Sequence, residues 1–331
     1  MQGSTMASDG SHLRIPSVDF RGLSLSSPGG GSWDAAREQL MSALESFGCF
    51  EAIYDAVSEG AKDQLFRGVL PELFKLPREI KIRNEYVGLP YHGYIYQSPH
   101  APFDSLRIED SPSLHSVQEF TSLMWPDGNP TFSNAAWTAA KQVQELELMV
   151  VRMILQSMDV ERHYDSLAES LIHSVRFSEY GIPFDQETKV NIKAHADANM
   201  LTVVCQYEVD GLEVQARDGE WIRVVSQPNS FTVMLGEAFQ AWSNGRLRAA
   251  RHRLRVTGHQ TRCSVVFNSR PKDEILFQAP NELIDEDHPL RFRPYKYPDY
   301  IRFRFSTEGR PNHPEDPLQA YVGVEGQLNA A

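Results

Sequence analysis

The residues with the clearest chemical potential are two histidines and one aspartate in the second half of the chain. His195 and Asp197 stand two positions apart, and His252 follows much later. Side chains two positions apart on an extended strand project from the same face, with Cα atoms about 6 to 7 Å apart. Two imidazoles and one carboxylate on one side of an ion leave neighbouring coordination positions open, which suits non-haem Fe(II) oxygen chemistry. The three residues therefore predict a metal site.

A single His-x-Asp pattern is weak evidence, because the chain contains 11 histidines and about one match is expected by chance. His163 and Asp165 form a second match, but they follow a predicted helix, where residues two apart diverge around the axis. A lone histidine among arginines, as His252 is, would by itself be a surface residue. The prediction becomes specific through the pair that follows, Arg262 and Ser264.

Arg262 and Ser264 share one face of a predicted strand, beyond a turn near Gly258. A buried guanidinium is costly unless an anion pairs with it. The sequence therefore predicts a cosubstrate that carries a carboxylate at some distance from the metal. The simpler alternative is that Arg262 lies in solvent at the end of a hairpin.

Composition narrows the class of protein. The 331 residues are 41 % hydrophobic and 23 % charged, which indicates a globular chain with a sizeable core. The net charge of −12 argues against general binding to nucleic acid or anionic membranes, because it repels phosphate. Cys49, Cys205 and Cys263 form no CxxC pair, so no zinc cluster or disulfide framework is indicated. With no leader or membrane segment apparent, we expect a cytoplasmic monomer.

The elements that must position these residues change character after about residue 172. Short alternating segments separated by turn signals predict an all-β sandwich or jelly roll. No βαβ repeat is present, which disfavours a nucleotide-binding parallel sheet. The predicted strands cover residues 174–180, 201–208, 212–216, 221–225, 230–235, 252–257 and 262–268.

The first half is predicted to be mainly helical, with two short strands. The pattern predicts strands at 16–20 and 50–53 and helices at 32–47, 58–75 and 133–160, with Ser32 as a cap and Gly48 as a stop. Residues 84–131 show no sustained period and are expected to be a substrate-side loop. We therefore expect a flexible N-terminus (1–12), an N-terminal region (13–172), a catalytic core (173–275) and a C-terminal cap region (276–331).

Taken together, the sequence resembles the plant 2-oxoglutarate- and Fe(II)-dependent dioxygenases, closest in texture to the AOP-type enzymes of specialised metabolism. The likeness runs from Ile15 to about Ser306. It is carried by residues 45–52, 93–94, 119–127, 195–204, 210–214, 242–247, 252–256 and 262–264. The resemblance implies an α+β fold: a double-stranded β-helix, or jelly roll, with N-terminal and C-terminal helices packed around it.

The resemblance also implies roles by position. Iron would be held by His195, Asp197 and His252, and the distal carboxylate of 2-oxoglutarate by Arg262 and Ser264. Tyr180 would assist. O2 would be the second cosubstrate, ascorbate would support the activity, and succinate and CO2 would leave. The departures from the family pattern are Ser178 where Asn is common, Ala196, Glu237 in place of Asp, and Cys263 in place of an aromatic residue.

The substrate is expected to be a small plant metabolite or hormone, and hydroxylation the reaction. Desaturation, demethylation or ring closure at the same centre is the first alternative, and a non-catalytic jelly-roll binding protein is the second. The side chains expected to line the substrate cavity, with simple core packing as the alternative for each, are Tyr91, Tyr94, Tyr96, Leu106, Phe267, Phe292, Tyr295, Tyr297 and Tyr300.

Overall fold

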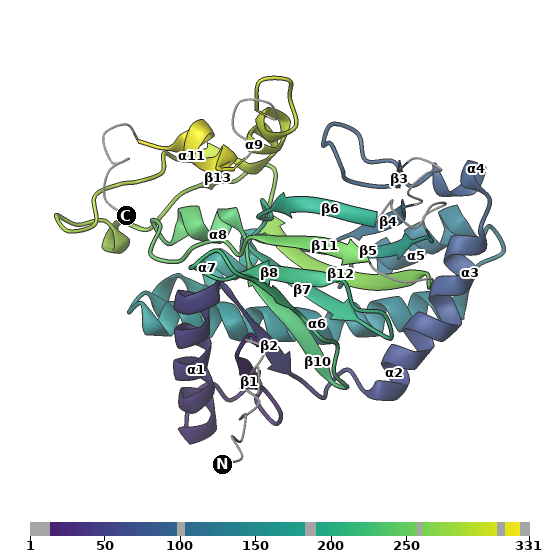
Figure 1. The fold of residues 1–331 in the computed structure, drawn as a ribbon, viewed down its shortest axis with the longest axis horizontal. Helices are drawn as coiled ribbons and strands as arrows, with labels where there is room; N and C mark the ends of the chain where they lie inside the picture. Colours follow the sequence, from purple (N-terminus) through teal and green to yellow (C-terminus); the bar gives the residue numbers. More distant parts are fainter. Residues whose placement is uncertain (1–13, 98–102, 183–189, 257–259, 310–314, 325–331) are drawn as a thin grey trace, which may run out of the picture.

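The computed structural model describes residues 14–97, 103–182, 190–256, 260–309 and 315–324. Two β-sheets lie face to face, with a long helix behind the larger one (Figure 1). The larger sheet has the order β1-β2-β10-β7-β12-β5-β4-β3, and the smaller one β6-β11-β8-β9. The arrangement confirms the predicted α+β jelly roll with helices around it.

The strands of the larger sheet are β1 (Ser17–Asp19), β2 (Cys49–Ile53), β10 (Ser230–Leu235), β7 (Leu201–Gln206), β12 (Arg262–Pro271), β5 (Leu171–Tyr180), β4 (Phe103–Glu109) and β3 (Ile95–Gln97). Those of the smaller sheet are β6 (Val190–His195), β11 (His252–Val256), β8 (Leu212–Gln215) and β9 (Trp221–Arg223). All the strands predicted from alternation are present. The expected boundary at residue 172 falls inside β5, and four strands of the larger sheet come from the region expected to be mainly helical.

The long helix α6 (Pro130–Ser157) covers the outer face of the larger sheet. Its buried residues Val143, Leu146, Val150 and Ile154 recur at three and four positions, so they form one apolar stripe. The predicted helix at 133–160 is confirmed, but it starts earlier. Asn129 accepts a hydrogen bond from the Phe132 amide (3.0 Å) and thereby caps the helix.

The helices near the N-terminus follow the predicted pattern with one correction. Helix α1 (Gly31–Phe47) begins after Gly30 without a side-chain cap, so the expected capping role of Ser32 is wrong. Its end at Gly48 is confirmed, because that residue has φ 69° and closes the last turn. The predicted helix at 58–75 is a continuous run of α2 (Glu59–Asp63), the π-helical segment Gln64–Val69 and α3 (Leu70–Lys75).

The two faces of the larger sheet have different neighbours. On β12, Arg262 and Ser264 lie on the face toward the smaller sheet, called the inner face below, and Val265 and Phe267 lie on the opposite, outer face. The outer face packs against α6 in the main hydrophobic core. On the inner face, residues of the larger sheet meet Leu254 and Val256 of β11.

The expectation that 84–131 is an irregular loop is wrong. The segment contains β3, β4 and α5 (Leu114–Met124). Strand β4 was missed although residues 105–109 alternate polar and apolar, because Phe103 and Asp104 depart from that alternation; its backbone pairs along its whole length with β5. Helix α5 carries a usable sequence signal, since Ser113 accepts from the Ser116 amide at its start and Val117 and Phe120 are buried.

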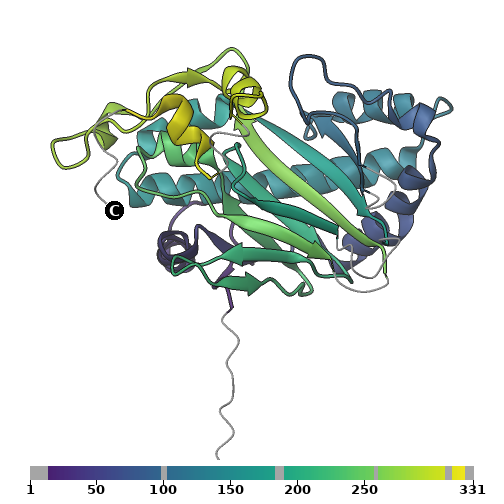
Figure 2. The same ribbon diagram turned by 45° about the horizontal axis from the view of Figure 1, so that its top comes forward.

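The C-terminal elements lie at one end of the two sheets (Figure 2). They include the β13–β14 pair (Leu276–Phe277 with Tyr295–Lys296), α9 (Tyr297–Arg304) and α11 (Pro317–Val322). The remaining short helices are α4 (Arg78–Lys81), α7 (Tyr164–Glu169), α8 (Glu237–Trp242) and the 3-10 segments Glu161–His163 and Asn281–Leu283. Within the described ranges, no helix has both the length and the apolar character that crossing a bilayer requires.

Candidate metal centre

The structure brings His195, Asp197 and His252 together at one end of the smaller sheet. His195 is the last residue of β6 and His252 the first of β11, and the two are direct partners in the strand register. Their ring centroids lie 4.4 Å apart. One ligand atom from each of the three residues lies within 4.8 Å of the other two. Asp197 differs from the expected position, because β6 ends at His195 and the aspartate follows in the next turn.

Both imidazoles present the same nitrogen to the centre. His195 Nδ1 lies 2.8 Å from the Lys193 carbonyl oxygen, and His252 Nδ1 lies 3.1 Å from that of Ala250. A carbonyl only accepts, so Nδ1 carries the proton and Nε2 keeps a free lone pair. The two Nε2 atoms lie 3.4 and 3.8 Å from the Asp197 carboxylate oxygens. This orientation by a neighbouring carbonyl is typical of metal-binding histidines.

The carboxylate is held from its other side. Thr202, at the start of β7, donates its hydroxyl hydrogen to Asp197 Oδ2 at 2.5 Å. Burial alone would raise the pKa of Asp197, but the adjacent His252, His195 and Thr202 outweigh it and hold the pKa well below its usual range. Burial lowers the pKa of His252 to about 4. At neutral pH the aspartate is therefore ionised and His252 neutral, and both are in the form that binds a metal.

The residue between the two ligands on this turn is fixed by the C-terminal helix α9. Arg304 Nη2 donates to the Ala196 carbonyl oxygen at 2.5 Å, and Arg304 also forms an ion pair with Glu237. The Glu237 backbone amide in turn donates to the Asp197 carbonyl oxygen at 2.7 Å. In Figure 1 the end of β6 and the start of β11 lie near α9. Neither Thr202 nor Arg304 was found from the sequence.

Arg262 lies inside the barrel and not in solvent, so the hairpin-end alternative is wrong. Its side chain is 1 % exposed. Nη2 donates to Gln206 Oε1 at 2.8 Å, and the guanidinium carbon lies 5.1 Å from the centroid of the Tyr180 ring. Nε and Nη1 are buried without a hydrogen-bond partner among the described residues. A buried guanidinium whose positive charge has no carboxylate partner is suited to binding an anion, and a carboxylate matches its planar N–H donors.

Ser264 and Tyr180 share the inner face with Arg262. Tyr180 is its direct partner on β5, and Ser264 is paired with Ser178 one step along the same strands. Ser178 shares a hydrogen bond of 3.0 Å with Ser105 on β4. The metal centre and the anion site therefore lie in one barrel. Their side chains are suited to a divalent metal ion and to a cosubstrate with two carboxylates.

Several expected substrate residues lie elsewhere. Leu106 and Phe267 are on the outer face of the larger sheet, in the main core, and so do not face Arg262. Tyr295 is 4 % exposed and packs against other aromatic rings in the same core. For these three, core packing is the observed role. Tyr91 is 41 % exposed and lies against Phe305 (4.4 Å between centroids), and Tyr94 is half-buried.

The remaining aromatic residues expected near the substrate are likewise either exposed or buried. Tyr96 is 41 % exposed and lies under the Arg78 guanidinium, 4.5 Å from its centroid. Phe292, Tyr297 and Tyr300 are buried. Among these, Tyr300 has a polar role, because its hydroxyl donates to Glu237 beside the metal centre.

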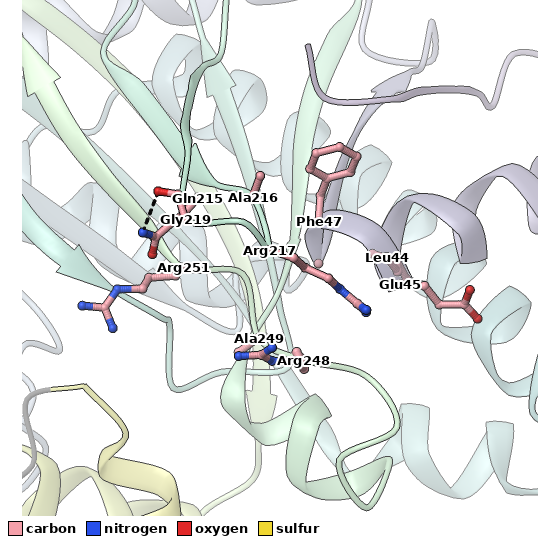
Figure 3. A pocket seen from close by; sticks show the side chains of 11 residues that line it. Leu44, Glu45, Phe47, Gln215, Ala216, Arg217, Gly219, Arg248, Ala249 and Arg251 are labelled. Atoms are coloured by element: carbon pink, nitrogen blue, oxygen red, sulfur yellow. Dashed lines mark hydrogen bonds between the residues drawn. The ribbon is translucent and has the colours of Figure 1, made fainter. Parts of the chain in front are cut away.

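A cavity of about 190 Å³ lies between the end of α1 and the turn that joins β8 to β9 (Figure 3). Gln215 Nε2 donates to the Gly219 carbonyl oxygen at its rim (3.0 Å). Arg217 and Arg248 contribute positive charge, and Phe47 an apolar wall. None of His195, Asp197 and His252 lines it, so it is separate from the metal centre.

Comparison with known proteins places these residues in context. The 2OG-Fe(II) oxygenase superfamily profile matches residues 171–271. The chain is 38 % identical over 302 residues to the probable 2-oxoglutarate-dependent dioxygenase AOP1.2 of Arabidopsis thaliana, across 89 % of this chain and 92 % of that protein. It is 28 % identical over 431 residues to the 2-oxoglutarate-dependent dioxygenase AOP2 of the same plant, across 94 % and 98 %.

Solved structures agree with these relatives. The rice dioxygenase for auxin oxidation superposes with a TM-score of 0.77 at 29 % identity, covering 94 % of this chain and all (100 %) of that one. The corresponding Arabidopsis thaliana enzyme, in its complex with 2-oxoglutarate, gives a TM-score of 0.73 at 25 % identity, covering 83 % and 100 %.

Proposed function

Because the chain belongs to the 2-oxoglutarate- and Fe(II)-dependent dioxygenases, we propose that it hydroxylates a small organic molecule at a centre formed by His195, Asp197 and His252. The family uses Fe(II), 2-oxoglutarate and O2. When bound, the iron and 2-oxoglutarate supply O2 activation: one oxygen atom enters a substrate C–H bond, and the other enters 2-oxoglutarate, which becomes succinate and CO2. The convergence of these three side chains is the observation that carries the proposal.

The proposed work of the protein is to hold the reactants in place. His195 and His252 direct Nε2 lone pairs at the metal, and Asp197 adds a negative charge that Thr202 keeps in position. Three protein ligands on one side leave the opposite side of an ion for the cosubstrates.

We assign the distal carboxylate of 2-oxoglutarate to Arg262, with Ser264 and Tyr180 beside it. Support comes from the two guanidinium nitrogens that lack a hydrogen-bond partner among the described residues and from the apolar surroundings, where an unpaired charge is costly. A carboxylate oxygen can accept from Nη1 and offset the charge of the guanidinium.

Further proposals concern the substrate class, the extent of the catalytic core, the oligomeric state and the cellular location. We infer that the substrate is a plant metabolite or hormone, as supported by neighbours named dioxygenases for auxin oxidation. We assign residues 173–275 as the catalytic core, with 13–172 and 276–331 around it. A monomer in the cytoplasm is our proposal for the assembly and its location, and it agrees with the three cysteines being free thiols.

The test is anaerobic binding, which needs no substrate. The Fe(II) and 2-oxoglutarate complex of the wild-type protein should show visible charge-transfer absorption. His195→Ala and Asp197→Ala should abolish this absorption, and also aerobic succinate formation, because each removes a ligand. Arg262→Gln should raise the 2-oxoglutarate requirement about tenfold to a hundredfold, since it removes a charge-assisted contact.

His115→Ala serves as the matched control, because His115 lies on the surface of α5 with 80 % of its side chain exposed. Thermal melting of each variant reports on the fold. Normal absorption in folded His195→Ala or Asp197→Ala protein would show that the metal centre is wrongly assigned. An unchanged 2-oxoglutarate requirement in Arg262→Gln would remove the anchor.

A further inference from the structure

The guanidinium of Arg262 has an uncharged partner inside the barrel, Gln206 at the end of β7. Arg262 Nη2 donates to Gln206 Oε1 at 2.8 Å, and both residues are buried. Within the described ranges, Arg262 forms no ion pair with a carboxylate. Asp210 acts on its charge through space, but Asp210 itself is bound to Arg223 (3.5 Å) and to the Ser226 amide (2.9 Å). The partner of the buried cation is therefore an amide, which leaves the charge in place.

The orientation of the Gln206 amide is set by two backbone groups of the smaller sheet. Oε1 also accepts from the Leu212 amide at 3.2 Å, and Nε2 donates to the Val224 carbonyl oxygen at 3.3 Å. Leu212 begins β8, and Val224 follows the end of β9. Because an amide N–H only donates and a carbonyl only accepts, these contacts determine which end of the side chain is oxygen. The oxygen end is the one that faces Arg262.

The aliphatic part of Arg262 is confined by the turn before β8. A Cβ atom at Gly211 would lie 3.0 Å from Arg262 Nε, 3.1 Å from its Cδ and 3.1 Å from Leu254 Cδ1. The absence of a side chain at Gly211 therefore lets the backbone cover the stem of the arginine closely. With Nη2 bound to Gln206, the atoms that lack a hydrogen-bond partner among the described residues are Nε and Nη1.

A carboxylate at the position of the Gln206 amide would change the charge of this site without changing its shape. It would accept the same hydrogen bonds from Arg262 and from the Leu212 amide, and it would also neutralise the guanidinium. Only the long hydrogen bond to the Val224 carbonyl would be lost. A buried ion pair of this kind holds its two members together, because each loses its compensation when the other leaves. An incoming anion would then meet a cation that is already paired.

We propose that Gln206 is a positioning residue whose lack of charge sets the affinity for the cosubstrate: it orients Arg262 and leaves the positive charge to the distal carboxylate of 2-oxoglutarate. This inference rests on the proposed function, which assigns that carboxylate to Arg262. It adds a requirement for the neighbour of the anchor. A negative charge at Gln206 should keep the protein stable and weaken the cosubstrate.

The experiment compares two 2-oxo acids by anaerobic titration of the charge-transfer absorption of the Fe(II) protein. 2-Oxopentanoate has the carbon chain and the 2-oxo acid end of 2-oxoglutarate but lacks the distal carboxylate. The wild-type protein should bind 2-oxoglutarate about tenfold to a hundredfold more tightly than 2-oxopentanoate, because only the former makes the charge-assisted contact. In Gln206→Glu this ratio should fall to about one or below, because the guanidinium is already neutralised. The affinity for 2-oxopentanoate should stay near that of the wild-type protein.

Gln206→Met separates the effect of charge from the effect of packing. It leaves the charge of Arg262 free and should keep part of the preference for 2-oxoglutarate. It also leaves Arg262 Nη2 and the Leu212 amide without their acceptor, which destabilises the protein. In metal-free protein with EDTA, Gln206→Glu should therefore melt at a higher temperature than Gln206→Met, although its preference for 2-oxoglutarate is the lower of the two. A residue with a purely structural role would give the same order in both measurements.

Gln215→Glu is the matched control, because Gln215 lies on β8 on the face opposite to the buried Leu212 and Val214. It should leave the ratio unchanged. An undiminished ratio in folded Gln206→Glu, or a ratio in Gln206→Met as low as in Gln206→Glu, would overturn the inference. Loss of the absorption with both acids in Gln206→Glu would also overturn it, because the role would not be confined to the distal carboxylate.

The wild-type protein tests the proposed function separately. No absorption with either acid would refute the metal centre, and equal binding of the two acids would refute Arg262 as the anchor.

Discussion

At the scale of single residues, the metal centre depends on groups that are not ligands themselves. Thr202 is 2 % exposed, and its hydroxyl holds one oxygen of Asp197. We expect Thr202→Val to weaken Co(II) binding about tenfold to a hundredfold, because a supporting hydrogen bond is lost while the shape is kept. Titration of the Co(II) absorption measures the affinity. Thr121→Val, in which a buried hydroxyl within α5 is removed, is the control, and equal affinities in both variants would contradict the prediction.

At the scale of elements, α9 acts as a brace for the turn between the first two ligands. Arg304 contacts the Ala196 carbonyl and pairs with Glu237, and 11 % and 6 % of their side chains are exposed. Arg304→Met should cost about 3 to 5 kcal/mol of unfolding free energy, because it leaves the Glu237 carboxylate buried without its partner. Urea denaturation measures this loss.

A double variant of Arg304 and Glu237 distinguishes an effect on protein stability from an effect on the position of the metal ligands. Adding Glu237→Gln to Arg304→Met should recover most of the stability, since no uncompensated charge remains. Metal affinity should stay reduced, because the contact to the Ala196 carbonyl is still absent. Wild-type Co(II) affinity in the folded double variant would show that α9 stabilises the protein without positioning the ligands.

At the scale of the whole molecule, metal binding should be coupled to folding. The three ligands come from β6, the turn after it and β11, which are distant in sequence, so an ion joins parts of the chain that separate on unfolding. A metal present at a hundred times its dissociation constant stabilises the folded state by about 2.7 kcal/mol. Thermal melts with Mn(II) should therefore show a higher Tm than melts with EDTA.

His195→Ala is the control for this linkage, and its melting should be the same in Mn(II) and EDTA. Melts of the wild-type protein that do not differ between the two conditions would show that the apoprotein does not bind the ion in its folded state. A shift of the same size in both proteins would indicate metal binding elsewhere on the chain.

The sequence by itself determined the class of fold and the identity of the reactive groups. Alternating strands of the jelly roll appear as a local pattern with a period of two, and the stripe of α6 appears with a period near 3.6. That His195 and His252 meet, and that Arg262 is buried, could be predicted because these residue types in this order are suited to binding a metal ion and an anion. These features are local in the chain or follow from chemistry alone.

Only the tertiary structure decided which face each strand turns toward the site. Leu106 and Phe267 are apolar residues on strands of the barrel, yet the register directs them to α6. The same register places the polar residues Arg107 and Arg176 on the inner face, whereas the polar face of an alternating strand is usually the one in solvent. A shift of one residue exchanges the two faces, and the register is set by pairing between distant segments. For the same reason, the contacts of Thr202 and Arg304 with the metal centre have no local signal in the sequence.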